Sequence, residues 1–186
     1  MKKEHKLYGM AAAIVLILAL WALFFHYYPV DQLVDKIGIQ NTYLAAFLLA
    51  VVGGFSSITG TSLYAALIAL AHGGMNPVAL GLIGGVGLFI SDSIFYFVAH
   101  RMRDVIAHVT SSWERLFRKM WRFTYIMPNW LVFGVIFLWS AFSPLPNDIL
   151  LAVLALSSYS YRQFAVFLFA GDLTMTLLLT HIAVSV

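Results

Sequence analysis

The chain contains no cysteine, and only 10% of its 186 residues are charged, whereas 62% are apolar. The absence of cysteine excludes disulfide bonds, thiolate metal sites and cysteine nucleophiles. The scarcity of charge is more decisive, because ordinary soluble domains carry about 25% charged residues. A soluble fold of this length could not hide so much apolar surface from water. The sequence therefore predicts an integral membrane protein, and it excludes soluble enzymes and nucleic-acid-binding proteins.

The motifs of membrane-embedded enzymes are missing as well. The chain has no His-Glu-x-x-His, no Gly-x-Ser-Gly and no aspartate pair in the style of intramembrane proteases. No two histidines stand at metal-ligand spacing. We therefore expect neither enzymatic activity nor a metal or cofactor. The expected partners are membrane lipids, above all their anionic headgroups. A homo-oligomer is compatible with the sequence.

The first half of the chain divides into apolar segments of unequal length. Residues 7–28 predict an N-terminal transmembrane helix, and a run without any charged side chain follows from Ile37 to Ser91. Helix breakers and hydroxyl residues interrupt that run at 53–62 and at 72–77, with a helix expected from about Leu63 to Ala71. A helix needs about 20 residues to cross a membrane, so the pieces around 53–62 predict a re-entrant hairpin.

A full span is expected from Val78 to His100, in which Gly81 and Gly85 would let another helix approach closely. Residues 101–122 then carry six basic side chains and an amphipathic stripe, which predicts two short surface helices joined near Thr110. Basic segments favour the cytoplasmic side. We therefore expect a multi-pass protein of the cell (inner) membrane whose N-terminus is cytoplasmic.

Residues 123–186 repeat the plan of residues 42–100. An apolar segment at 123–141, a break at 142–148, a short helix over 149–157 and a last span over 163–186 follow in order. A shift of 87 positions lays Gly84 on Gly171, and an odd number of crossings separates the copies. The sequence thus predicts a single all-α membrane domain over 1–186, an inverted repeat of two re-entrant hairpins with an amphipathic linker helix at 101–122.

Two segments resemble motifs of the DedA family, the VTT-domain or SNARE-associated Golgi proteins. Residues 91–101 resemble its Gly-Asp-x-x-x-Tyr-x-x-Gly-Arg segment, onto which Asp92, Tyr96 and Arg101 carry over. Residues 142–146 resemble its Arg-Phe-Ile-Pro hairpin, onto which Pro144 carries over, while Asn147 stands in the place of an arginine. The resemblance implies two opposed re-entrant hairpins and the movement of phospholipids or isoprenyl-phosphate lipids across the bilayer, with protons involved.

Three acidic residues in apolar surroundings are the main candidates for function, because an ionised carboxylate inside a membrane is costly. Asp92 and Asp172 lie within predicted spans, and Asp148 opens the short helix of the second hairpin. Their simpler roles are hydrogen bonding near the interface for Asp92, and helix capping for Asn147 or Asp148. For Asp172 we expect a partner on another helix. The remaining candidates lie at the hairpin tips: Thr59, Gly60, Thr61, Ser62, Pro144, Pro146 and Asn147.

These features together favour a lipid flippase or scramblase in which two hairpins form a polar notch for the headgroup. The alternatives are an ion- or proton-coupled transporter of a small solute and a structural membrane protein without transport activity. The sequence alone does not choose among them.

Overall fold

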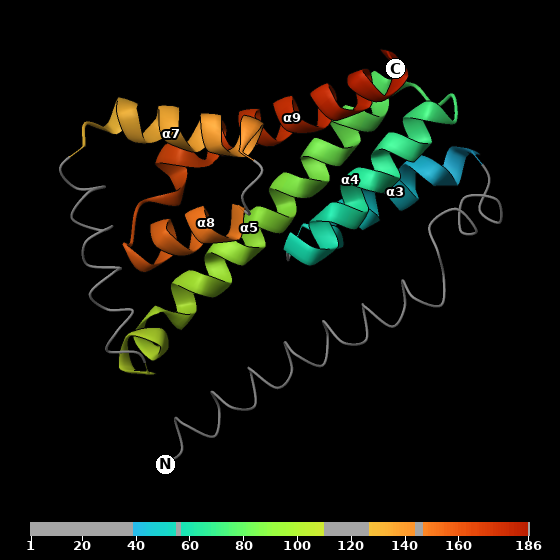
Figure 1. Ribbon diagram of the computed structural model, residues 1–186. Helices are drawn as coiled ribbons and strands as arrows, with labels where there is room; N and C mark the ends of the chain where they lie inside the picture. Colours follow the sequence, from blue (N-terminus) through green and yellow to red (C-terminus); the bar gives the residue numbers. More distant parts are fainter. Residues whose placement is uncertain (1–38, 55–56, 110–126, 144–146, 186) are drawn as a thin grey trace. The chain divides into compact units, whose positions relative to one another are not determined.

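The computed structural model describes residues 39–54, 57–109, 127–143 and 147–185, and in these ranges the regular structure is entirely α-helical (Figure 1). The chain divides into two units, residues 1–42 and 43–186, and the account below concerns the second. The predicted helix at 7–28, the linker beyond Val109, Pro144 and Pro146 lie outside the described residues.

Two long helices form the frame. Helix α5 spans Pro77–Val109 and helix α9 spans Tyr161–Ser185. The apolar segments Pro77–Met102 and Tyr161–Ser185 are long and apolar enough to cross a membrane. Helix α5 begins where Asn76 Oδ1 accepts hydrogen bonds from the amides of Val78 and Ala79, a helix cap followed by proline at the first helical position.

The end of α5 differs from the prediction. The helix continues for nine residues beyond His100, where we expected the span to stop and a separate surface helix to begin. Residues 101–109 contain neither proline nor glycine, so nothing breaks the helix where the sequence turns from apolar to basic.

Helices α5 and α9 pack antiparallel and at very short range, as the glycine pair predicted. A methyl group at Gly81 would lie 2.9 Å from Leu177 Cα, and one at Gly85 would lie 2.9 Å from Leu173 Cα. Thr176 Oγ1 also donates across the interface to the Gly81 carbonyl, at 2.7 Å. Such small-residue contacts and polar links hold helices together where lipid removes the hydrophobic driving force.

Four shorter apolar helices surround this frame. The first helix pair consists of α3 (Ile39–Gly53) and α4 (Ser57–His72), and the second of α7 (Asn129–Phe142) and α8 (Asn147–Leu156). Helix α4 begins six residues before the predicted Leu63, so the hydroxyl-rich stretch is helical despite Gly60. Helix α7 begins later than predicted, directly after Pro128, whose fixed φ suits the position before a helix.

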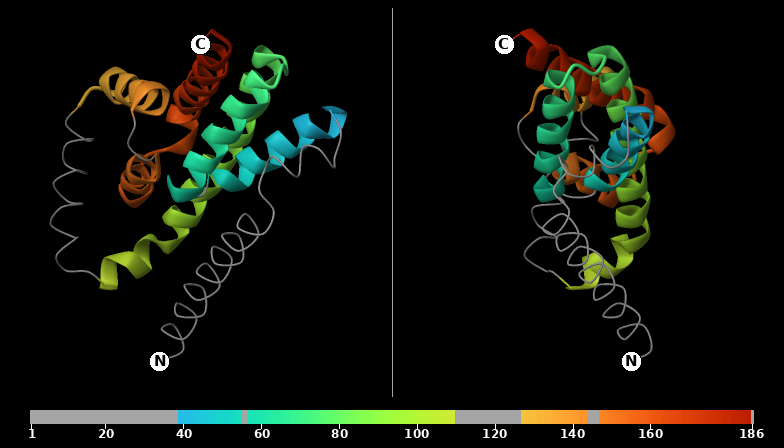
Figure 2. Two further views of the ribbon diagram at one scale, coloured as in Figure 1. Left: turned by 45° about the vertical axis from the view of Figure 1, so that its right-hand side comes forward. Right: turned by 90° about the vertical axis from the view of Figure 1, so that its right-hand side faces the viewer.

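Each long helix packs against a short helix from the other half of the chain. Helix α4 packs along α9, and helix α8 packs along α5, as the two views in Figure 2 allow the reader to follow. Helix α5 also exposes large apolar side chains along its length, in a stripe that winds around the helix: Val78, Leu82, Val86, Ile94, Phe97 and Val98.

Each long helix also meets one short helix at a glycine. A methyl group at Gly87 would lie 2.6 Å from Ala50 Cβ of α3, and one at Gly171 would lie 2.5 Å from Ser140 Cβ of α7. Gly84, which the 87-residue shift paired with Gly171, instead faces Leu67 of α4. Gly87, and not Gly84, therefore makes with α3 the kind of close contact that Gly171 makes with α7.

Candidate functional site

The connections within both helix pairs reach the same point on α5. In the first pair, a methyl group on Gly54 would lie 2.7 Å from Ser91 Cβ. In the second pair, Asn147, the first residue of α8, donates from Nδ2 to Asp92 Oδ2 at 2.9 Å. Residues 91 and 92 are thus the place where two segments far apart in the sequence converge.

A second carboxyl group shares this amide. Asn147 Nδ2 also donates to Asp172 Oδ1 of α9, at 3.3 Å. Only 1% of the Asp92 surface and none of the Asp172 surface is exposed. The other oxygen of Asp172, Oδ2, is buried and has no hydrogen-bond partner among the described residues. Three helices, α5, α8 and α9, therefore contribute one polar side chain each to a closed cluster, which we call the carboxyl–amide cluster (Asp92, Asn147 and Asp172).

The described cations lie away from this cluster. Arg101 is exposed and lies nine residues further along α5 than Asp92, about 13 Å of helix. Arg162 at the start of α9 is exposed as well. Within the described part of the chain, neither Asp92 nor Asp172 forms an ion pair.

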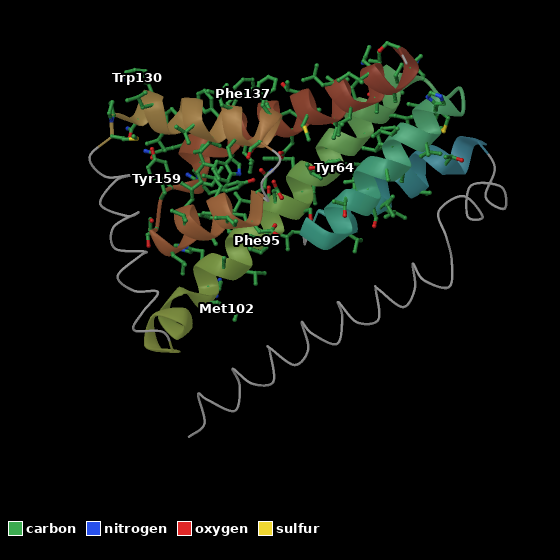
Figure 3. All side chains as sticks on the ribbon, in the orientation of Figure 1. Tyr64, Phe95, Met102, Trp130, Phe137 and Tyr159 are labelled. Atoms are coloured by element: carbon green, nitrogen blue, oxygen red, sulfur yellow. The ribbon has the colours of Figure 1, made fainter. Side chains whose placement is uncertain are left out.

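Other polar groups face the cluster from neighbouring helices. The half-buried Tyr64 of α4, labelled in Figure 3, lies within electrostatic reach of Asp92, Asp172 and Asp148. Tyr161 of α9 likewise reaches Asp92 and Asp172, and its hydroxyl forms a hydrogen bond with Ser93. The cluster is therefore acidic on balance, with phenol hydroxyls around it.

Several residues predicted for the functional site lie outside the carboxyl–amide cluster. Tyr96 is buried in an aromatic cluster, where its ring stacks on His100 and its hydroxyl donates to the carbonyl of Tyr159. Thr61 and Ser62 are exposed on α4, beyond the partly exposed Gly60. The side chain of Thr59 lies outside the described residues.

Asn147 has a role that its position did not indicate. We expected Asn147 or Asp148 to cap α8 through a side-chain oxygen that accepts from backbone amides. The amide nitrogen of Asn147 bridges two carboxyl groups on two other helices. The expectation that Asp172 has its partner on another helix is confirmed by the same bond. Asp148 lies half-buried in the first turn of α8.

Sequence reasoning missed four polar groups near the glycine contacts and the carboxyl–amide cluster. Tyr64 gave no signal, because a tyrosine in an apolar helix is ordinary. The other three are buried groups that have no hydrogen-bond partner among the described residues: Ser91 Oγ, Trp139 Nε1 and Ser140 Oγ. Ser91 and Ser140 lie against Gly54 and Gly171 respectively. Their proximity depends on helix packing that the sequence does not state.

The arrangement can hold and release protons, and it can offer hydrogen bonds to a polar group that enters. The described residues include no group of three side chains of the kind that hold a metal ion. Comparison of the chain with protein-family models, with curated proteins and with solved structures gives no match.

Proposed function

We propose that this protein is a membrane lipid transporter, a flippase or scramblase of phospholipid or isoprenyl-phosphate lipids with the fold of the DedA family. The observation that carries the proposal is the carboxyl–amide cluster, which lies in the middle of two membrane-length helices where both helix pairs converge. Buried ionisable groups in membrane-spanning helices are costly, and they commonly mark a transport pathway.

The apolar surface supports a position within the bilayer. The exposed stripe on α5 and the 70% exposed Trp130 of α7 would be unfavourable in water and suit lipid. The four shorter helices have 10 to 16 residues each. Because about 20 residues are needed to cross the hydrocarbon region, these pairs would enter and leave on one side as re-entrant hairpins.

The glycine contacts support an inverted repeat. Phe47, Ala50 and Val51 of α3 face Gly87 through the same atoms with which Phe137, Ser140 and Ala141 of α7 face Gly171. The residues of α3 and α7 are offset by 90 positions and the two glycines by 84. Helices α5 and α9, which carry these glycines, run antiparallel. Two similar units in opposite orientation are the plan of many transporters, with the substrate site between the repeats.

In this proposal the cluster is the polar point past which the headgroup moves, while the acyl chains stay in lipid. Asp92 and Asp172 are buried in the structure. In this proposal, the structure therefore represents an occluded conformation. Opening separates the second helix pair from α5 and α9, and the three side chains then lose their mutual bonds. The headgroup supplies the replacement hydrogen bonds.

The proposal is tested with the purified protein in liposomes that carry a fluorescent phosphatidylethanolamine or a fluorescent isoprenyl phosphate. A membrane-impermeant quencher reports how fast the inner-leaflet lipid reaches the outer leaflet. We expect the wild type to accelerate this exchange, and Asp92→Asn to slow it by at least about tenfold. The matched control is Arg162→Gln, which changes an exposed charge at the start of α9.

A liposome that shows movement of a small solute or of charge without lipid exchange would favour the solute transporter. Lipid exchange at the rate of protein-free liposomes, by protein that remains folded, would contradict the proposal. Exchange that is equally fast in wild type and Asp92→Asn would leave a lipid scramblase that does not use the cluster.

A further inference from the structure

We infer that Asp92 and Asp172 form a one-proton pair, in which Asp172 carries the proton, Asp92 carries the negative charge, and Asn147 positions both. The inference names the coupling group for the proposed transport, and in that respect it depends on the proposed function. The proton site itself is a property of the cluster, and it can be measured in the absence of transport.

The geometry limits the charge that the pair can carry. Both carboxyl groups accept from one nitrogen, at 2.9 and 3.3 Å, so the two accepting oxygens are at most about 6.2 Å apart. Like charges at such separations oppose each other, and burial adds the loss of hydration. With no cationic side chain bonded to either group in the described residues, a second negative charge would have no compensation. A single proton on the pair removes that second negative charge.

The bonds of Asn147 distinguish the two carboxyl groups. The shorter bond goes to Asp92, as expected for an ionised acceptor, because hydrogen bonds to charged groups are shorter and stronger. Asp172 receives the longer bond, and its Oδ2 is fully buried with no partner in the part of the chain that the structure describes. An uncompensated negative charge on that oxygen would be the costliest in the cluster. The proton therefore belongs to Asp172.

A proton fits this place better than a sodium ion. A metal ion needs oxygen ligands on several sides. The amide of Asn147 directs N–H groups, which cannot coordinate a metal, at both carboxyl groups. The described residues also provide no third carboxylate or histidine arranged for a metal. A bare proton requires only the carboxyl oxygen.

The neighbouring helices contribute further titratable groups. Tyr64 of α4, Asp148 of α8 and Tyr161 of α9 all interact electrostatically with one or both members of the pair. The two tyrosines are neutral at neutral pH. A negative charge on Asp148 would favour retention of the proton, in the same direction as repulsion within the pair. None of these groups supplies the positive charge that would displace it.

Infrared spectroscopy of the full-length protein in lipid nanodiscs provides the test, because a protonated carboxylic acid has a carbonyl band separate from that of a carboxylate. We expect the wild type to show such a band at neutral pH and to lose it only in alkaline buffer. Asp172→Asn should remove the band. Asp92→Asn should retain the band but lose it at lower pH, because the repulsion within the pair is gone.

The variant Asn147→Ala should shift the titration in the opposite direction. Its amide stabilises the charged carboxylate, so its removal should keep the band to higher pH than in the wild type. Arg162→Gln, which changes an exposed side chain at the start of α9, is the control and should leave the titration unchanged. If Asp172→Asn does not fold, the opposite shifts of Asp92→Asn and Asn147→Ala decide the question.

Absence of the band from the wild type at neutral pH would overturn the inference, as would an identical titration in wild type and Asp92→Asn. A band that persists in folded Asp172→Asn would assign the proton elsewhere. A band that disappears when sodium chloride replaces choline chloride would show a sodium site. A band with the expected titration in a protein that moves no lipid would support the proton pair and contradict the proposed transport function.

Discussion

The two helix pairs reach the centre of the second unit (residues 43–186) with different chemistry. The first pair arrives with Gly54, whose lack of a side chain allows its backbone to lie against Ser91. The second arrives with Asn147, whose amide bonds to two acids on two long helices. The helices behind these residues differ as well, because α4 has 16 residues and α8 has 10.

The two connections are therefore held in place by different kinds of interaction. The first connection is positioned by steric fit, so its requirements are small size and exact spacing. The second is positioned by hydrogen bonds to groups that can be protonated, so we expect its position to depend on pH. If one pair moves during transport, the second is the one with a chemical reason to do so.

The largest effect is expected at Gly87 and Gly171, where each long helix meets a short helix most closely. Gly87→Val and Gly171→Val would each place side-chain atoms where a methyl already lies within 2.6 Å of another helix. Overpacking of this kind typically costs about 1–3 kcal/mol and sometimes more. We expect both variants to lose most of the folded protein in detergent, measured by size-exclusion chromatography and thermal unfolding.

Gly134 provides the matched control for these variants, because a methyl group there meets no atom within 4 Å. Gly134→Ala should therefore be neutral or stabilising by up to about 1 kcal/mol, the helix-propensity difference. A Gly171→Val variant as stable as Gly134→Ala would show that α7 does not need its close contact with α9.

The next effect tests the steric role of the first connection. Gly54→Ala should destabilise the fold by about 1–3 kcal/mol through its clash with Ser91. The double variant Gly54→Ala, Ser91→Gly moves the side chain from one partner to the other and should recover much of that loss. Thermal unfolding of the four proteins measures the coupling between the two positions. Additive effects would mean that the contact does not position the pair.

The sequence predicted the order of elements well and their contacts poorly. The breaks at 72–77 and 142–148 were correctly predicted because glycine, asparagine and proline act locally. The close approach at Gly81 and Gly85 also followed from spacing. The bridge at Asn147 was not predicted, because a local rule for helix caps cannot show that two acids from α5 and α9 lie beside the same amide.

A smaller effect is expected at the interface of α5 and α9. Thr176→Val should remove the hydrogen bond to the Gly81 carbonyl while keeping the shape of the side chain, at a cost of about 1 kcal/mol. Thr174→Val is the control, since Thr174 donates to the Ala170 carbonyl of its own helix. Equal melting temperatures for the two variants would mean that the interhelical bond contributes nothing beyond packing.

The smallest effect is expected at Asp148, the acid that lies beside the cluster on the second pair. It occupies the first turn of α8, where a negative charge interacts favourably with the helix dipole, an effect of about 0.3–1 kcal/mol. Asp148→Asn keeps the size and hydrogen-bonding groups while it removes the proton equilibrium. We therefore expect a stability loss below about 1 kcal/mol and lipid exchange within about twofold of the wild type. A loss of exchange as large as that in Asp92→Asn, in a protein with unchanged melting temperature, would place Asp148 in the transport pathway and extend the acidic site along α8.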